Sequence, residues 1–134
     1  MSVRHHELCF GCGRQNLFGL QMELERDGEG GVAGRFFVKQ DHQGPPGVAH
    51  GGIVATALDE AMALAVHAEE ILALTTNLEI ALKRPVAVGS IVEVSARIES
   101  RQGGRIRVSA EAVDERGEAC ALARGEFVEV EAAA

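Results

Sequence analysis

The 134-residue chain has no tryptophan and no tyrosine, and it has only five phenylalanines. Hydrophobic residues still make up 46% of the sequence, so aliphatic side chains must fill the core. No apolar run reaches the ~18–20 residues that a membrane-spanning helix needs, and the N-terminus lacks the apolar centre of a secretion signal. We therefore expect a single cytoplasmic domain over residues 1–134, with a core of its own and no membrane partner.

Positive charge is also scarce. The chain has 13 Lys and Arg against 20 Asp and Glu, which gives a formal net charge of −7. This balance argues against non-specific nucleic-acid binding, because that requires a basic face to neutralise phosphates. A small anionic ligand held by a few local cations is compatible with it.

Cysteine is too rare, and odd in number, for a full disulfide framework. Cys120 lies in an apolar strand pattern, where we expect a small buried side chain. In "HHELCFGC", Cys9 and Cys12 form a C-x-x-C that could bind zinc together with His5 or His6. No second C-x-x-C or H-x₃₋₅-H follows at a suitable spacing. We therefore expect the two cysteines to pack the N-terminal segment onto the fold, and we predict no metal and no cofactor.

The rest of the chain predicts an α+β fold. Residues 1–18 read as irregular, and residues 50–68 as one helix preceded by the Gly- and Pro-rich loop "DHQGPPGVAHGG". Alternation of polar and apolar residues, clearest from Ile91 to Glu99, is typical of antiparallel strands with one covered face. Six strands are expected, over residues 19–26, 31–40, 73–86, 90–100, 105–115 and 118–130. One antiparallel six-stranded sheet wrapped around one central helix fits this order.

The helix "HGGIVATALDEAMALAVHA" is apolar on nearly every side, yet it carries Asp59 among core-type neighbours. Burying an unpaired carboxylate costs several kcal/mol or raises its pKa, and a carboxyl in such a place suits a general base or nucleophile. The alternative is that Asp59 faces solvent or pairs with a distant Arg. We expect the polar side of the helix to be the stripe of Thr56, Glu60, Ala63 and His67.

Two glycines follow His50 at the start of this helix. Gly51 and Gly52 leave backbone N–H groups uncovered where the helix dipole favours negative charge, a place that can stabilise an oxyanion. The alternative is a tight turn that only glycine allows, with His50 as a cap. Gly51 and Asp59 are eight residues apart, about 12 Å along a helix, so one carbonyl cannot touch both. If both act on one substrate, they come from different subunits of a dimer.

The stretches "HQGPPGVAHGGIVATALDEAMA" and "TTNLEIALKRPV" resemble the hotdog-fold acyl-CoA thioesterases of the phenylacetic-acid-degradation (PaaI-like) type. The leading "CFGCGRQNLFGLQMEL" resembles the N-terminal segment of a subgroup of that family, so the likeness runs from about Cys9 to Val128. It implies a hotdog fold, a long helix wrapped by an antiparallel sheet. It also implies a homodimer or a tetramer built from two dimers, and an acyl-CoA substrate.

The resemblance also implies roles for single residues. Gly51 would donate its amide to the thioester carbonyl, and the helix Asp of the other subunit, Asp59, would act as base or nucleophile. Thr75 would position the water or the carboxylate, while Thr76 faces the opposite way. Many relatives carry Asn or Gln where this chain has Gly44, so the neighbouring Gln43 or His42 would take the supporting role, and we assign it to Gln43.

Coenzyme A would need cations for its phosphates. Lys83 and Arg84 match the "KRP" of the family, and Arg101 and Arg105 flank the turn after the next strand. Each of these could instead be a solvated surface charge. Together with the amide of Gly52 and the hydroxyl of Thr76, Lys83 and Arg84 form the predicted substrate-binding set.

Two other functions are compatible with the same fold. An acyl-thioester hydratase or dehydratase would use a His with a helix carboxylate, for which His50 and Glu60 are the candidates. A non-catalytic acyl-thioester binding module would need no carboxylate at position 59, so Asp59 argues against it.

Overall fold

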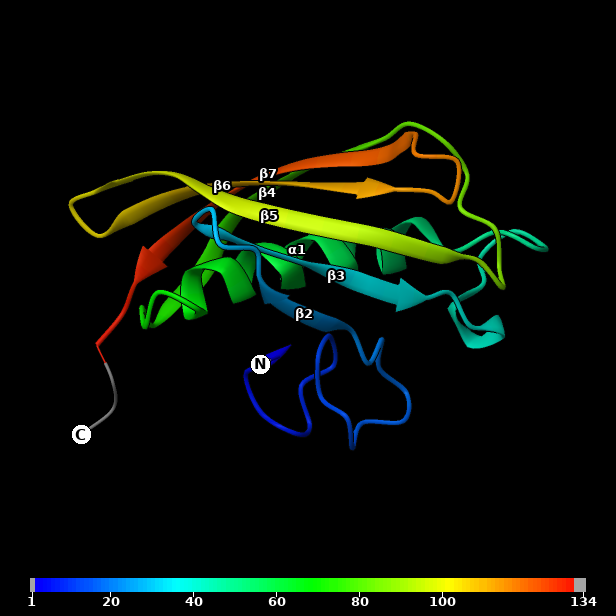
Figure 1. Cartoon of the computed structure of the whole chain (residues 1–134), viewed down its shortest axis with the longest axis horizontal. Helices are drawn as coiled ribbons and strands as arrows, with labels where there is room; N and C mark the ends of the chain where they lie inside the picture. The colour runs from blue at the N-terminus through cyan, green and yellow to red at the C-terminus, as the bar shows by residue number, and fades with distance from the viewer. Residues whose placement is uncertain (1, 132–134) are drawn as a thin grey trace.

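The computed structural model describes residues 2–131, in which one long helix packs against one antiparallel sheet (Figure 1). The long helix α1 is Gly51–His67, and a 3-10 helix, η1, covers Gln40–His42. No helix in this part of the chain is long and apolar enough to cross a membrane. The strands are β1 Ser2–Val3, β2 Glu23–Arg26, β3 Gly31–Phe37, β4 Ala73–Leu82, β5 Ile91–Gln102, β6 Arg105–Val113 and β7 Ala119–Glu129.

The sheet has seven strands in the order β1-β2-β3-β5-β6-β7-β4, where six were expected. The additional strand, β1, pairs Ser2 with Glu25 and Val3 with Leu24. Two residues are too short to show any periodicity, which is why this strand could not be seen in the sequence. The six expected strands are confirmed, most of them shorter than predicted.

Strand β2 begins at Glu23, and not at residue 19, because the backbone before it has another partner. Leu20 N–H donates to the Phe10 carbonyl and Met22 N–H donates to the Gly11 carbonyl. The N-terminal segment, residues 4–18, is thereby fastened to the chain that leads into β2, and both lie at the β1 end of the sheet (Figure 1).

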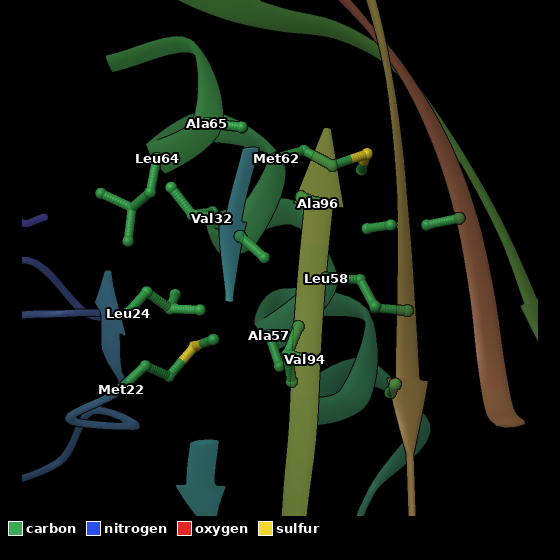
Figure 2. Close-up of a cluster of buried hydrophobic side chains, with 14 of the residues drawn as sticks. Met22, Leu24, Val32, Ala57, Leu58, Met62, Leu64, Ala65, Val94 and Ala96 are labelled. Carbon is green, nitrogen blue, oxygen red and sulfur yellow. The ribbon is translucent and has the colours of Figure 1, made fainter. Parts of the chain in front are cut away.

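The core lies between α1 and the concave face of the sheet (Figure 2). In Figure 2, Leu58 and Met62 of α1 point toward the sheet, while Met22 and Leu24 close the core from the side of β2. Most of α1 is buried because the sheet curves around it and the N-terminal segment covers a further side. The aliphatic core expected from the shortage of aromatic residues is confirmed, and Phe36 and Phe127 are its only buried phenylalanines within residues 2–131.

One expectation about the helix is wrong. Glu60 was placed on the polar side of the helix, but it is only 9% exposed. The reason is the N-terminal segment, which the helix pattern alone does not reveal. A Cβ at Gly11 would lie 2.4 Å from Cγ of Glu60, so the glycine allows the segment to pack directly onto this side chain.

Candidate active site

The site predicted around Asp59 lies between the middle of α1 and the first half of β4. Thr75 Oγ1 donates a hydrogen bond of 2.9 Å to Asp59 Oδ1. Asp59 is half-buried and Thr75 is exposed, so the carboxylate borders both the core and the solvent. This arrangement agrees with a carboxylate at the edge of an apolar region and not with a fully solvated one.

The environment of Asp59 disfavours its charged form. Burial raises the pKa of Asp59, the hydrogen bond from Thr75 opposes that rise, and the negative charge of Glu60 adds to it. The net shift is upward. A carboxylate with a raised pKa binds a proton more readily, as a general base must.

The two glycine amides at the start of α1 differ in their hydrogen bonding. His50 is the N-cap, and its Nδ1 accepts a hydrogen bond of 2.9 Å from Gly52 N–H, which confirms the capping role. Gly51 N–H has no acceptor within residues 2–131. The amide of Gly51 is therefore available to a ligand, whereas that of Gly52 already serves the cap.

The structure does not bring His50 and Glu60 together as a hydratase pair would require. His50 lies at the N-terminus of α1 with its ring turned back to Gly52, while Glu60 contacts the N-terminal segment more than two turns further on. Ten residues of helix separate them by about 15 Å. By the same measure, Gly51 and Asp59 of one chain lie on different turns of α1 and cannot meet on one carbonyl.

Gln43 and His42 lie in the loop before α1 and differ in exposure. Gln43 is exposed, and its Oε1 accepts a hydrogen bond of 2.5 Å from Gly47 N–H, closing the loop. His42 is 2% exposed, and its Nδ1 accepts from Lys39 N–H at 3.1 Å. Of the two, only Gln43 has a side chain that a substrate could reach.

Thr76 occupies a bulge in the pairing of β4 with β7, since Thr75 pairs with Phe127 and Asn77 with Glu126. Its hydroxyl donates to the Glu126 carbonyl of β7 at 3.1 Å, whereas the hydroxyl of Thr75 donates to Asp59. The bulge lets two successive threonines serve different neighbours.

Lys83 and Arg84 follow the end of β4, whereas Arg101 and Arg105 lie at the opposite end of the sheet, near the first residues of β4. Arg84 forms an ion pair of 2.6 Å with Glu118, and Arg101 forms one of 2.8 Å with Glu129. Lys83 and Arg105 make no ion pair within residues 2–131. Lys83 borders a hollow on the outer face of the sheet, on the side away from α1, whose wall also includes Arg97 and Arg124.

A second cluster of chemically active side chains lies against Glu60. His5 Nδ1 is 3.0 Å from Glu60 Oε2, and Cys9 Sγ is 3.5 Å from both carboxylate oxygens. Hydrogen bonds to Cys12 and Glu60 raise the pKa of His5 to about 11. Burial is the largest influence and raises the pKa of Glu60, but the hydrogen bonds with His5, Cys12 and Cys9 and the charge of His5 together outweigh it, and the net shift is downward.

Sequence reasoning identified His5, Cys9 and Cys12 as a possible metal-binding set and missed Glu60. The sequence gives one sign of its role: Glu60 is a second carboxylate on the apolar helix, next to Asp59. Cys120, in contrast, lies where it was expected, fully buried with its thiol donating to the Ala112 carbonyl.

Residues 46–121 match the family model of the thioesterase superfamily, and the chain belongs to that superfamily. A curated relative, acyl-coenzyme A thioesterase THEM4 of the mouse, is 34% identical over 76 residues, which are 55% of this chain and 33% of the relative. The match therefore spans only about a third of the length of that relative.

Solved structures identify the fold as a hotdog fold, as the sequence resemblance implied. The crystal structure of a thioesterase superfamily protein has a TM-score of 0.85 at 26% identity, covering 90% of this chain and 62% of that one. The Escherichia coli PaaI protein of the phenylacetic acid degradation operon has a TM-score of 0.78 at 20% identity, covering 84% and 81%. The smu.793 protein of Streptococcus mutans, solved with acetyl-CoA, has a TM-score of 0.76 at 17% identity, covering 81% and 88%.

Proposed function

We propose that this chain is an acyl-CoA thioesterase, which hydrolyses the thioester of a small or medium acyl-CoA. The observation that carries the proposal is the hydrogen bond from Thr75 to Asp59, a half-buried carboxylate with a raised pKa, in a chain of the thioesterase superfamily. The THEM4 relative and the acetyl-CoA complex of a protein with the same fold support the substrate class.

In the proposed reaction, water adds to the thioester carbonyl, the C–S bond breaks, and the products are a carboxylic acid and the thiol of coenzyme A. Asp59 takes a proton from the attacking water, or it attacks the carbonyl itself and expels the CoA thiolate to give a mixed anhydride. Water then hydrolyses that anhydride to the acid and regenerates Asp59. Thr75 holds one carboxylate oxygen, which leaves the other to face the reaction. The reaction requires no redox chemistry.

Gly51 supplies the oxyanion donor in this proposal. Its N–H has no acceptor within residues 2–131 and stands at the positive end of the α1 dipole. Since Asp59 of the same chain lies about 12 Å away along the helix, the Gly51 that serves it belongs to a second subunit. The active site is then completed only at a dimer interface, twice in each dimer.

The edge strand β4 supplies a surface for that dimer. Within residues 2–131 it pairs only with β7, which leaves its other edge open there, and the large apolar side chains Leu74, Leu78 and Leu82 are 62%, 39% and 56% exposed. An open apolar edge is a place where a second chain can add its own strand. Pairing of β4 with β4 of another chain would bury these leucines next to Thr75. The same pairing would serve a homodimer or a tetramer built from two such dimers.

Coenzyme A would lie with its phosphates near the cations that follow β4. Lys83 is the first candidate because it makes no ion pair within the described part of the chain, whereas Arg84 is held by Glu118. Gln43 would help to orient the thioester from the loop before α1. Thr76 and the Gly52 amide have partners within this chain and are assigned no contact with the substrate.

Release of free thiol from a panel of acyl-CoAs tests the function, with the wild-type protein measured beside Asp59→Asn. Hydrolysis that collapses in a folded Asp59→Asn variant supports the proposal. Consumption of an enoyl-CoA without thiol release would identify a hydratase instead. Tight acyl-CoA binding without turnover would identify a binding module.

A further inference from the structure

We propose that His5, Cys9, Cys12 and Glu60 form a zinc-binding site that fastens the N-terminal segment to the central helix. The proposal goes beyond thioester hydrolysis and does not depend on it. One ligand atom from each of the four residues lies within 4.8 Å of each of the others. Three come from the loop between β1 and β2, and the fourth comes from the middle of α1.

Three of the four close contacts among these atoms have the spacing of ligands in a tetrahedral site, and the fourth is slightly shorter. Zinc binds thiolate sulfur, imidazole nitrogen and carboxylate oxygen at about 2.0–2.3 Å, so its ligands stand about 3.3–3.8 Å from one another. Here Cys9 Sγ is 3.5 Å from both oxygens of Glu60 and 3.6 Å from His5 Nδ1. Cys12 Sγ is 3.8 Å from His5 Nδ1, and His5 Nδ1 is 3.0 Å from Glu60 Oε2.

The cluster is crowded around one imidazole nitrogen. His5 Nδ1 lies near three groups at once, two sulfurs and a carboxylate, and can bond well to only one of them. A divalent cation at the centre would contact all four groups. Two sulfurs, an imidazole and a carboxylate this close together are a donor set that selects zinc over magnesium or calcium.

The surroundings are shaped for these ligands. The backbone N–H of His5 donates to Cys12 Sγ at 3.2 Å, a hydrogen bond that steadies a thiolate. Gly11 lies inside the C-x-x-C, and a Cβ there would come within 2.4–2.7 Å of three atoms of the Glu60 side chain. Glu60 and Cys12 are buried, while 29% of the His5 side chain is exposed, which leaves a route by which the ion can enter.

The site would have a structural role. Its four side chains fill a tetrahedral zinc shell and leave no open position for a substrate, as in zinc sites that stabilise small folds. Because Glu60 is the neighbour of Asp59 on α1, the ion would hold the N-terminal segment against the helix that carries the proposed base.

The first test is elemental analysis of the full chain, purified with zinc present and under reducing conditions. We expect close to one zinc ion per chain. After removal of the metal with a chelator, titration with Co²⁺ should give the visible bands of a tetrahedral site and the near-ultraviolet charge-transfer band of thiolate ligands. Zinc should then abolish both, and should raise the midpoint of thermal unfolding of the stripped protein.

Matched pairs of variants identify the ligands in the same titration. Cys9→Ser should reduce the charge-transfer band, whereas Cys120→Ser should keep it in full. His5→Ala and Glu60→Gln should each weaken Co²⁺ binding about 100-fold or more, because even outer-shell partners of ligands contribute about 10–100-fold. Their controls, His6→Ala and Asp59→Asn, replace the neighbouring residues and should bind as the wild type does.

Measurements on the wild type alone can overturn the proposal, even if some variants do not fold. It is wrong if the protein purified with zinc and reductant contains none and its Co²⁺ titration gives no thiolate band. A band that persists in the Cys9→Ser/Cys12→Ser double variant, or equal binding by Glu60→Gln and wild type, would also reject this set of ligands.

Discussion

Thr75 Oγ1 and Asp59 Oδ1 are 2.9 Å apart, and their hydrogen bond joins the edge strand β4 to the middle of α1. It holds the carboxylate at the border between the core and the solvent, with no second partner within residues 2–131. In the proposed hydrolysis, the free oxygen is the one that would take the proton.

Replacement of Asp59 by Asn should abolish most of the thioesterase activity while the fold remains. The amide keeps the size and the hydrogen bond with Thr75 but cannot accept a proton, and a positioned general base contributes about 10²–10⁴-fold to a rate. The measurement is kcat/KM for thiol release, with circular dichroism as the check on folding. Glu69→Gln, which removes an exposed carboxylate just beyond α1, is the control and should remain active. Full activity in Asp59→Asn would contradict the mechanism.

Thr75→Val should lower kcat by about 10–150-fold, because it removes a hydrogen bond to a charged group worth roughly 1.5–3 kcal/mol while keeping the shape of the side chain. KM should change little if Thr75 acts by holding Asp59. Thr75→Ser retains the hydroxyl and should recover most of the rate. A Thr75→Val variant with unchanged kcat and raised KM would assign Thr75 to substrate binding instead.

The amide of Gly51 can be removed without breaking the helix. Gly51 is the first residue of α1, a position that accepts proline, and His50 before it has φ −60° and ψ 136°, the extended backbone that a residue before proline prefers. Gly51→Pro should therefore fold and lose about 10²–10³-fold in kcat, the usual effect of losing one oxyanion donor.

Gly51→Ala is the matched control, since its Cβ meets the same atom, Leu82 Cδ1 at 2.9 Å, but its N–H remains. It should retain far more activity than Gly51→Pro. Equal losses in the two variants would mean that contact with Leu82, and not the amide, limits the rate.

The sequence predicted the parts of this molecule that depend on local patterns. Alternation located the six longer strands, and the apolar run after His50 located α1 and its cap. Asp59 was noticed because a charge interrupts that run. Its pairing with Thr75 followed from the family resemblance, since no local pattern relates a helix to a strand.

Contacts between distant segments were not predictable in this way. Glu60 lies 51 residues from Cys9, and its position on the helix indicated exposure until the N-terminal segment was placed over it. The burial of His42 likewise arises from packing of the loop before α1. It could not be predicted, because nothing in "DHQGPPG" distinguishes a buried histidine from an exposed one.

Buried His42 should make the protein less stable in mild acid. Burial lowers the pKa of His42, and the charge of Lys39 lowers it further, so the folded state resists protonation. The unfolded chain, with an ordinary histidine pKa near 6.5, binds the proton first. As far as His42 contributes, the free energy of unfolding should thus be constant above about pH 6.5. Below pH 6.5 it should decrease, by at most about 1.4 kcal/mol per pH unit, until the pKa of the folded state is reached.

His42→Asn tests this contribution, because an amide oxygen can accept from Lys39 N–H in place of Nδ1 and does not titrate. Urea unfolding at a series of pH values should show a shallower loss of stability in acid for the variant than for the wild type. Parallel curves would show that other groups cause the acid sensitivity.

The composite site predicts that activity and assembly fail together when β4 is altered. Lysines in place of Leu74 and Leu78, which are 62% and 39% exposed on the open edge strand, would place charges where a second chain is proposed to pair. The double variant should run as a monomer in light scattering after gel filtration and should lose nearly all thiol release, although Asp59, Thr75 and Gly51 are intact. Leu17→Lys, at a side chain that is 75% exposed on the N-terminal segment, should change neither property. An active monomer would show that one chain contains the whole site. That result would contradict the proposed mechanism, because Gly51 and Asp59 of one chain lie too far apart along α1 to act on the same carbonyl.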